Sequence, residues 1–263
     1  MHGNGPQVGD ALLRNERARD DVSELPLGVL VAATAGWIGY MIQQSLQNAL
    51  HAARADRRVV TLITQVEVDL GAPDALEPRK FIGRPVDPGL AEALRRDGWA
   101  VEEADHGSLR RRVPSPAPTR IVEAPMIAEL VSSGHVVIAA GGGGTPIYRD
   151  PRLGLEGLDV VVDKDLAAAL LAREIRASVL LILTDVDGVY RGYGTPAAER
   201  IDRLAASGAR ALLVSDELGE GSMRPKLEAA LRFVEGGGER AIIAALEDAP
   251  RAARGEAGTR IEP

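Results

Sequence analysis

Ser178-Val179-Leu180-Leu181-Ile182-Leu183-Thr184 is the stretch that decides the fold, because it is apolar on both faces of an extended chain. Such runs are typical of strands that helices cover on both sides of a parallel sheet. Further runs of this character lie at 59–63, 135–139 and 241–244. Helical spacing occurs between the runs, over residues 26–57, 121–132, 166–176 and 225–234. The alternation predicts an α/β fold, a doubly wound, mainly parallel sheet with helices on both faces.

The segment 71–118 interrupts this alternation. It holds seven prolines and the basic cluster 110–112. Because proline removes a backbone donor, this density predicts no regular core elements and indicates an excursion from the sheet. We expect a small, protruding, lid-like subdomain over 71–118, with a plain surface insertion as the alternative. The surrounding chain, 1–263, is expected to form a single domain that closes with a strand at 257–261.

Composition excludes several classes of function. The net charge of −7 over 263 residues argues against a nucleic-acid-binding face, which would be basic. The absence of cysteine excludes disulfides and thiolate metal sites, and a reducing cytoplasm is the simplest setting. Residues 25–42 carry no charge, but they include Pro26 and several glycines. We therefore expect a buried or subunit-interface helix there rather than a membrane span.

Two loops that follow predicted strands carry groups suited to phosphate chemistry, because ligands gather at the carboxyl ends of strands in open α/β sheets. Four glycines at 141–144 follow the run 135–139, and residues without Cβ let amide N–H groups converge on an anion. Asp185 and Asp187 follow the run 178–184 and suit a nucleotide or its metal. The alternatives are a flexible turn for the glycines and a turn-capping role for the aspartates.

Two lysines occur where helices are predicted to begin. Lys164 is flanked by Asp163 and Asp165, which keep it charged and direct it, a pattern that suits neutralisation of phosphate oxygens. Lys226 follows Pro225 in a first helical turn, where free amides and the helix dipole favour an anion. Taken singly, each lysine has a structural alternative beside a capping residue. Together with the glycine-rich strand end, they favour phosphoryl chemistry.

Motifs in order along nearly the whole chain resemble those of carbamate kinases, a branch of the amino-acid kinase family. They are residues 2–9 (HGNGPQVG), 64–69 (TQVEVD), 78–83 (PRKFIG), 110–116 (RRRVPSP), 141–146 (GGGGTP), 162–167 (VDKDLA), 183–187 (LTDVD) and 221–226 (GSMRPK). The resemblance implies an amino-acid kinase-like three-layer sandwich, a protruding subdomain, a homodimer and a place in arginine metabolism. It also implies phosphorylation of carbamate by ATP with Mg²⁺, or the reverse formation of ATP from ADP and carbamoyl phosphate.

The same resemblance assigns roles to residues at matching positions. Lys80 resembles the subdomain lysine that reaches the substrate. Lys164 and Lys226 resemble the lysines on the transferring phosphoryl group, and Asp163 and Asp165 resemble residues that organise them. The implied substrate-binding residues are Asn4, Gly5, Gly141, Gly142, Gly143 and Gly144. The implied nucleotide-binding residues are Asp185, Val186, Tyr190 and Met223, and no protein side chain is assigned to the metal.

The sequence departs from the family pattern at two places. Arg224 stands where the family has glycine, which brings a large cation near the phosphates. The family's N-terminal strand and Gly-Gly-Asn loop are missing from this sequence, and their loss would expose neighbouring strand edges. Besides a carbamate kinase whose start is placed too late, two hypotheses follow. One is a catalytically impaired remnant that only binds nucleotide or dimerises, and the other is a kinase for a different carboxylate or carbamate.

Overall fold

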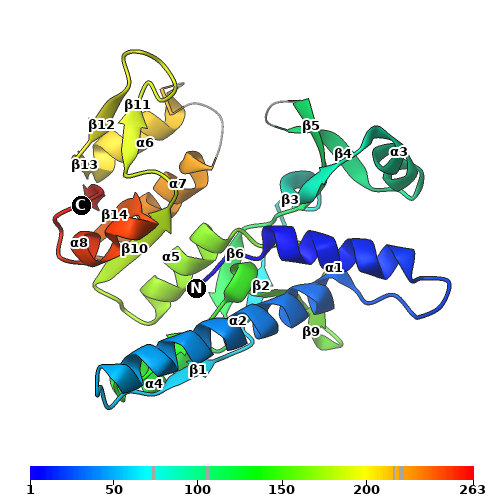
Figure 1. The fold of residues 1–263 in the computed structure, drawn as a ribbon, viewed down its shortest axis with the longest axis horizontal. Helices are drawn as coiled ribbons and strands as arrows, with labels where there is room; N and C mark the ends of the chain where they lie inside the picture. The colour runs from blue at the N-terminus through cyan, green and yellow to red at the C-terminus, as the bar shows by residue number, and fades with distance from the viewer. Residues whose placement is uncertain (73–74, 105–106, 216, 219–221) are drawn as a thin grey trace. The chain divides into compact units, whose positions relative to one another are not determined.

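The structure, a computed structural model, describes residues 1–263 apart from 73–74, 105–106, 216 and 219–221. Figure 1 shows its elements, coloured from the N-terminus to the C-terminus. The chain divides into two compact units, residues 1–167 and 168–263, and the boundary falls within helix α5 (Lys164–Glu174). Each unit combines strands with helices packed on them, so the predicted α/β class is confirmed.

Unit 1 begins with two helices that pack against each other, α1 (Gly5–Arg17) and α2 (Leu27–Ala52). Residues 2–9 contain three glycines, a composition typical of a loop that approaches a ligand, but the chain is helical from Gly5 onward. Pro6 fits the first turn, where a missing N–H costs nothing, and Val8 and Leu12 lie on one buried face. Gly9 allows α1 to approach the subdomain, because a Cβ at this position would overlap the backbone of Gly83.

Helix α2 contains the uncharged stretch 25–42 almost entirely. One face is buried and consists of Leu27, Gly28, Leu30, Val31, Thr34, Ala35, Ile38 and Gly39. Within the residues that the structure describes, no helix is long and apolar enough to cross a membrane.

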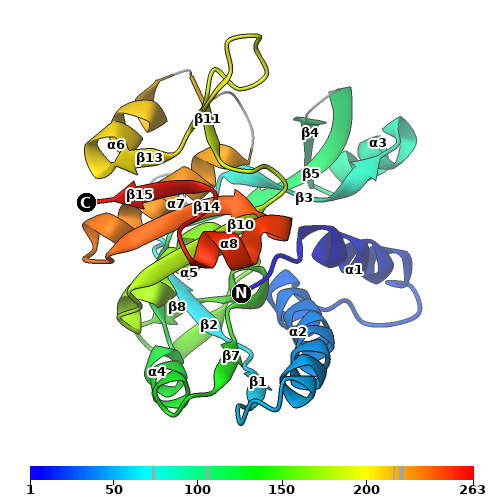
Figure 2. The ribbon, with the colours of Figure 1, turned by 60° about the vertical axis from the view of Figure 1, so that its left-hand side comes forward.

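Two sheets form the body of unit 1. Strands β1 (Val59–Thr61) and β7 (Val136–Ile138) pair in parallel, as the runs 59–63 and 135–139 predict. Figure 2 shows these strands between α2 and α4 (Ala124–Ser132). The second sheet has the order β6-β2-β8-β9. Its strands are β2 (Gln65–Val68), β6 (Pro118–Ile121), β8 (Thr145–Asp150) and β9 (Gly154–Gly157).

The proline-rich segment folds into a small three-stranded sheet of order β3-β5-β4 with one helix. Our expectation that its prolines exclude regular core elements was wrong, because Ile82 of β3 and Val113 of β5 belong to the hydrophobic core. Pro78 begins β3, Pro114 ends β5 and Pro88 lies in the first turn of α3, positions where a proline N–H is not needed. Residues 73–74 and 105–106 of the expected subdomain lie outside the described residues. The elements are β3 (Pro78–Val86), α3 (Pro88–Arg96), β4 (Ala100–Ala104) and β5 (Ser108–Pro114).

Unit 2 is built on a four-stranded sheet of order β10-β14-β15-β13. Strands β10 and β14 are parallel, as the runs 178–184 and 241–244 predict, and β15 is antiparallel to β14 and confirms the expected closing strand. In the described part of the chain, β10 pairs only with β14 and β1 only with β7, so each has one unpaired edge. The strands are β10 (Val179–Thr184), β13 (Arg203–Ala205), β14 (Arg240–Ala245) and β15 (Thr259–Glu262).

Helices cover both faces of this sheet. Helices α7 (Met223–Glu235) and α8 (Ala249–Ala253) both contact β14, and Figure 2 shows them on opposite faces. Helix α6 (Ala206–Val214) packs on α7. A hairpin of β11 (Val189–Arg191) and β12 (Glu199–Ile201) completes the unit.

Candidate functional site

Asp163 joins the start of helix α5 to the small subdomain of unit 1. Its Oδ1 accepts hydrogen bonds from the backbone N–H groups of Asp165 at 2.9 Å and Leu166 at 3.2 Å, so it caps the helix. Its Oδ2 forms an ion pair with Lys80 of β3. The carboxylate lies at the N-terminus of α5, where the helix dipole favours its negative charge. It thereby holds the Lys80 ammonium group close to the start of this helix.

The surroundings of Asp163 shift the pKa of its carboxyl group in opposite directions. Burial alone would raise the pKa of its carboxyl group. The Lys80 charge and hydrogen bond, with the two backbone N–H groups, outweigh burial and hold the pKa of Asp163 below its usual range. The pair is therefore an ionised carboxylate with a cation at neutral pH.

Lys164 has a separate partner. Its Nζ donates to both carboxylate oxygens of Asp165, at 2.9 and 3.0 Å. The Lys164 side chain is 38% exposed, whereas that of Asp165 is 10% exposed. The Lys164 stem lies beside Gly3, where a Cβ would stand 3.3 Å from Lys164 Cδ. Each aspartate thus organises a different lysine, Asp163 with Lys80 and Asp165 with Lys164.

Asn4 is buried beside the glycine turn at 141–144. Its Nδ2 donates to Thr34 Oγ1 at 2.9 Å, and its side chain lies against Gly142. A Cβ at Gly142 would overlap the Asn4 carboxamide, and the φ of 69° at this position is itself unfavourable for other residues. Gly5 is the first residue of α1 and is partly buried.

The amide groups of the glycine turn have protein partners. The N–H of Gly142 donates to His2 O at 2.8 Å, and those of Gly143 and Gly144 donate to Ala140 O and Gly141 O, each at 3.1 Å. Gly143 also packs on the carbonyl of Val162, the residue before Asp163. The four glycines therefore allow close backbone packing between the opening segment and the start of α5. A role for them in substrate binding stays a prediction.

Unit 2 carries the third lysine. Lys226 lies in the first turn of α7, is 6% exposed, and donates from Nζ to Ser222 O at 3.2 Å. Arg224 points to a different place, since its guanidinium donates to the carbonyls of Leu213 and Ser215 at the end of α6. It therefore caps the end of α6, where a cation is favourable. Gly221 of the same motif lies outside the described residues.

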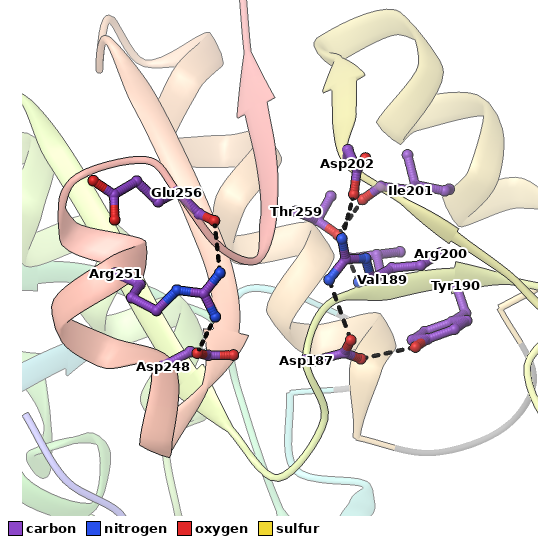
Figure 3. A network of polar contacts seen from close by, with 10 residues as sticks. All are labelled: Asp187, Val189, Tyr190, Arg200, Ile201, Asp202, Asp248, Arg251, Glu256 and Thr259. Carbon is purple, nitrogen blue, oxygen red and sulfur yellow. Dashed lines mark hydrogen bonds and ion pairs between the residues drawn. The ribbon is translucent and has the colours of Figure 1, made fainter.

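The predicted nucleotide-binding residues of unit 2 lie around the loop after β10. Asp185 is exposed and accepts a hydrogen bond from Thr184 Oγ1 at 2.9 Å, and Val186 and Met223 are partly buried. Tyr190 donates from its hydroxyl to Asp187 at 2.8 Å, as Figure 3 shows. This hydrogen bond is the main reason that the pKa of Tyr190 is raised.

Unit 1 brings Lys80, Asp163, Lys164 and Asp165 together, with the opening segment packed beside them. Such a group can neutralise oxyanions, because ammonium groups held by carboxylates keep their charge and direction.

Sequence reasoning missed His2 and Thr34, which position the glycine turn and Asn4. It also missed a compositional signal. The chain has three lysines against twenty-eight arginines, and all three are the predicted catalytic lysines.

Comparisons with known proteins agree with this picture. A sequence model described as "Amino acid kinase family" matches residues 1–245. "Carbamate kinase" of Pyrococcus furiosus is 43% identical over 100% of this chain and 84% of its own length. "Carbamate kinase" of Halobacterium salinarum is 46% identical over 100% of this chain and 83% of its own. The structure "Carbamate kinase from Giardia lamblia bound to AMP-PNP" has a TM-score of 0.88 at 37% identity, and covers 99% of this chain and 83% of that chain.

Proposed function

The chain belongs to the amino acid kinase family, and on that premise we propose that it transfers a phosphoryl group reversibly between ATP and carbamate. The products are ADP and carbamoyl phosphate. The observation that carries the proposal is that two aspartates at the start of α5 each hold a lysine, Asp163 holding Lys80 of β3 and Asp165 holding Lys164. The similarity to carbamate kinases over the full chain supports carbamate as the acceptor.

The chemistry of the transfer explains why lysines are needed. A phosphoryl group in flight spreads negative charge over its oxygens, so catalysis consists of positioning and charge neutralisation. We propose that Lys164 and Lys226 contact the transferring group and that Lys80 contacts the carbamate end of the substrate. Asp163 and Asp165 act as positioning residues, because they hold lysines and are not free to attack phosphorus.

The nucleotide is proposed to bind to unit 2, against Asp185, Val186, Tyr190 and Met223. The Giardia lamblia relative bound to AMP-PNP supports a nucleotide site in a protein of this fold. Mg²⁺ is proposed to enter with the nucleotide as part of the substrate. Magnesium usually binds through phosphates and one or two carboxylates, so a dedicated protein cage is unnecessary.

The acceptor is proposed to bind to unit 1, against Asn4, Gly5 and the glycine turn of Gly141, Gly142, Gly143 and Gly144. The rigid packing of Asn4 on Gly142 supports this, since a substrate loop must be fixed within a few tenths of an ångström to be useful. Arg224 is proposed to have no part in the transfer, because its guanidinium caps α6.

We test the activity by measuring ATP formation from ADP and carbamoyl phosphate. The unmodified chain should turn over, and Lys164→Ala should lower kcat by about 100-fold or more, the usual cost of removing one charge-stabilising donor. Acetate, glutamate and aspartate replace carbamate in the forward direction to test acceptor choice. Arg152→Ala, an exposed loop residue, is the control. Absence of turnover in the unmodified chain, or full activity in Lys164→Ala, would contradict the proposal.

We also propose that a second copy of this chain covers the outer face of α2. Side chains exposed on this helix are Val29 (46%), Trp37 (45%), Tyr40 (61%) and Met41 (48%). They recur at helical spacing, so they form one outward stripe opposite the buried face. Residues 27–50 carry no charge, so two copies of the stripe can meet without repulsion, and an exposed apolar stripe of this kind marks an interface.

A further inference from the structure

An arginine-lined cavity of about 230 Å³ lies in unit 2, beside strands β13 and β15. Its lining includes Arg200, Arg203 and Arg260 and the loop 255–258. The cavity opens on the face covered by α8, because Ile242 lines it and packs against Ala252 of that helix. Helix α7, which carries Lys226, lies on the opposite face of the sheet (Figure 2), so the cavity is separate from the Lys226 position.

The strand register places two of these arginines side by side. Arg203 of β13 is directly opposite Arg260 of β15 in the parallel pair. Residues opposite one another on adjacent strands project to the same face of a sheet, where like charges are destabilising. The sheet therefore carries a like-charge repulsion that a bound anion would offset.

The carboxylates at the cavity are directed to other partners. Asp202 accepts from Arg200 Nη2 at 2.7 Å, and Arg200 also donates to Asp187 at 3.2 Å. Glu256 accepts from Arg254 with both oxygens, each at 3.0 Å. Figure 3 shows the Glu256 carboxylate pointing away from Arg200. Neither acid lies between Arg203 and Arg260 as a counter-ion.

The two opposed arginines are only weakly neutralised. Arg260 donates to the carbonyl of Gly255 at 2.9 Å and reaches Glu262 only at 3.5 Å. The Arg203 side chain forms no hydrogen bond or ion pair with any residue in the described part of the chain. A guanidinium offers paired donors that match an oxyanion. We propose that this cavity binds a small dianion of the phosphate type, held between Arg203 and Arg260.

The first test is calorimetric titration of inorganic phosphate into the full chain that carries Lys164→Ala, so that phosphate binding at the proposed transfer site is weakened. Ionic strength is kept constant with chloride. We expect saturable binding that Arg203→Gln weakens by about tenfold or more, the loss of one charge-assisted hydrogen bond. The control Arg57→Gln, an exposed arginine of unit 1, should bind like its parent. Absence of saturable binding, or equal affinity in the two arginine variants, overturns the proposal.

The second test uses thermal unfolding of the otherwise unmodified chain. In phosphate-free buffer Arg203→Gln should raise the Tm, because the like-charge pair is removed. Phosphate should raise the Tm of the unmodified chain more than that of Arg203→Gln, because only the former keeps both arginines. A variant that unfolds, or that has a lower Tm in phosphate-free buffer, shows that Arg203 stabilises the sheet itself and overturns the proposal. This result does not depend on kinase activity, so it is distinguishable from failure of the proposed function.

Discussion

The protein contains only three lysines, and all of them lie at predicted catalytic positions. Arginine provides every other basic side chain apart from histidine. Lysine is a compact point charge on a flexible stem, so it can follow a moving phosphoryl group, whereas the fork of arginine suits fixed pairs.

The three ε-amino groups should differ in reactivity. With an acetylating reagent at limiting dose, Lys164 should be modified before Lys226, because the side chain of Lys164 is 38% exposed whereas Lys226 is 6% exposed. Peptide mass spectrometry reads each position separately. Denatured protein, in which all lysines are accessible, is the control. Equal modification rates for Lys164 and Lys226 in the folded protein would contradict the burial described here.

The lowered pKa of Asp163 makes a prediction about acid stability. Folding favours the charged form of Asp163. Its contribution to the free energy of unfolding is therefore complete above the ordinary aspartate pKa of about 3.9, and it is lost as the pH falls through the lower pKa of the folded state. Asp163→Asn keeps a capping oxygen but removes the charge. Urea denaturation should show a difference in unfolding free energy between the unmodified chain and Asp163→Asn that shrinks below about pH 4.

The control for this experiment is Asp20→Asn, since Asp20 is exposed and has no hydrogen-bond partner in the described part of the chain. This substitution should change the free energy of unfolding little, because it removes no ion pair or hydrogen bond of the Asp20 side chain. A difference for Asp163→Asn that does not change between neutral pH and pH 3 would show that the ion pair with Lys80 has no linkage to folding.

The glycine turn allows close backbone packing in this structure. Its backbone approaches Asn4 on one side and Val162 on the other, and three of its amide groups donate to protein carbonyls, that of Gly142 to His2 of the opening segment. The turn thereby ties the opening segment to the start of α5, where Asp163 and Lys164 lie.

Gly142→Ala should destabilise the protein by about 2–4 kcal/mol, since it adds overlap with Asn4 to the strain of a left-handed backbone. The matched control is Gly98→Ala. Gly98 has a similar positive φ of 89° but open space around a Cβ, so this change should cost only about 1–2 kcal/mol. Chemical denaturation measures both. Equal losses would mean that contact with Asn4 contributes nothing.

The elements differ in how well the sequence predicts them. Strands β10 and β14 are apolar on both faces, a local pattern, and were predicted correctly. Helix α1 was missed because glycines at 3, 5 and 9 indicate a loop, whereas burial of Val8 and the contact of Gly9 with Gly83 are tertiary effects. The prolines at 78, 88 and 114 misled us because their effect depends on position within an element rather than on their number.

In the candidate site, too, local contacts could be predicted from the sequence and tertiary contacts could not. The string Asp163-Lys164-Asp165 is local, and it predicted that both aspartates hold Lys164. Asp165 does so, whereas Asp163 pairs with Lys80 instead. Lys80 is 83 residues from Asp163 in sequence, so no spacing rule predicts their ion pair. The family resemblance supplied Lys80 as a candidate, and only the fold supplies its partner.

The complete molecule is expected to be a dimer through α2. Trp37→Glu places a charge in the apolar stripe, so it should convert the dimer to monomer in light scattering after gel filtration. Val214→Glu is the matched control, since Val214 is apolar, 83% exposed and located on α6. A monomer before mutation, or a dimer that survives Trp37→Glu and dissociates with Val214→Glu, would contradict an α2 interface.

The proposed reaction requires two lysines to contact one phosphoryl group, Lys164 at the start of α5 and Lys226 at the start of α7. The decisive measurement is a crystal structure of the protein with Mg-ADP, carbamate and a planar fluoride mimic of the phosphoryl group. We predict that Nζ of Lys164 and Nζ of Lys226 both lie within about 3.2 Å of the mimic. A mimic contacted by neither lysine, or by Lys226 alone with Lys164 turned to solvent, would contradict the mechanism.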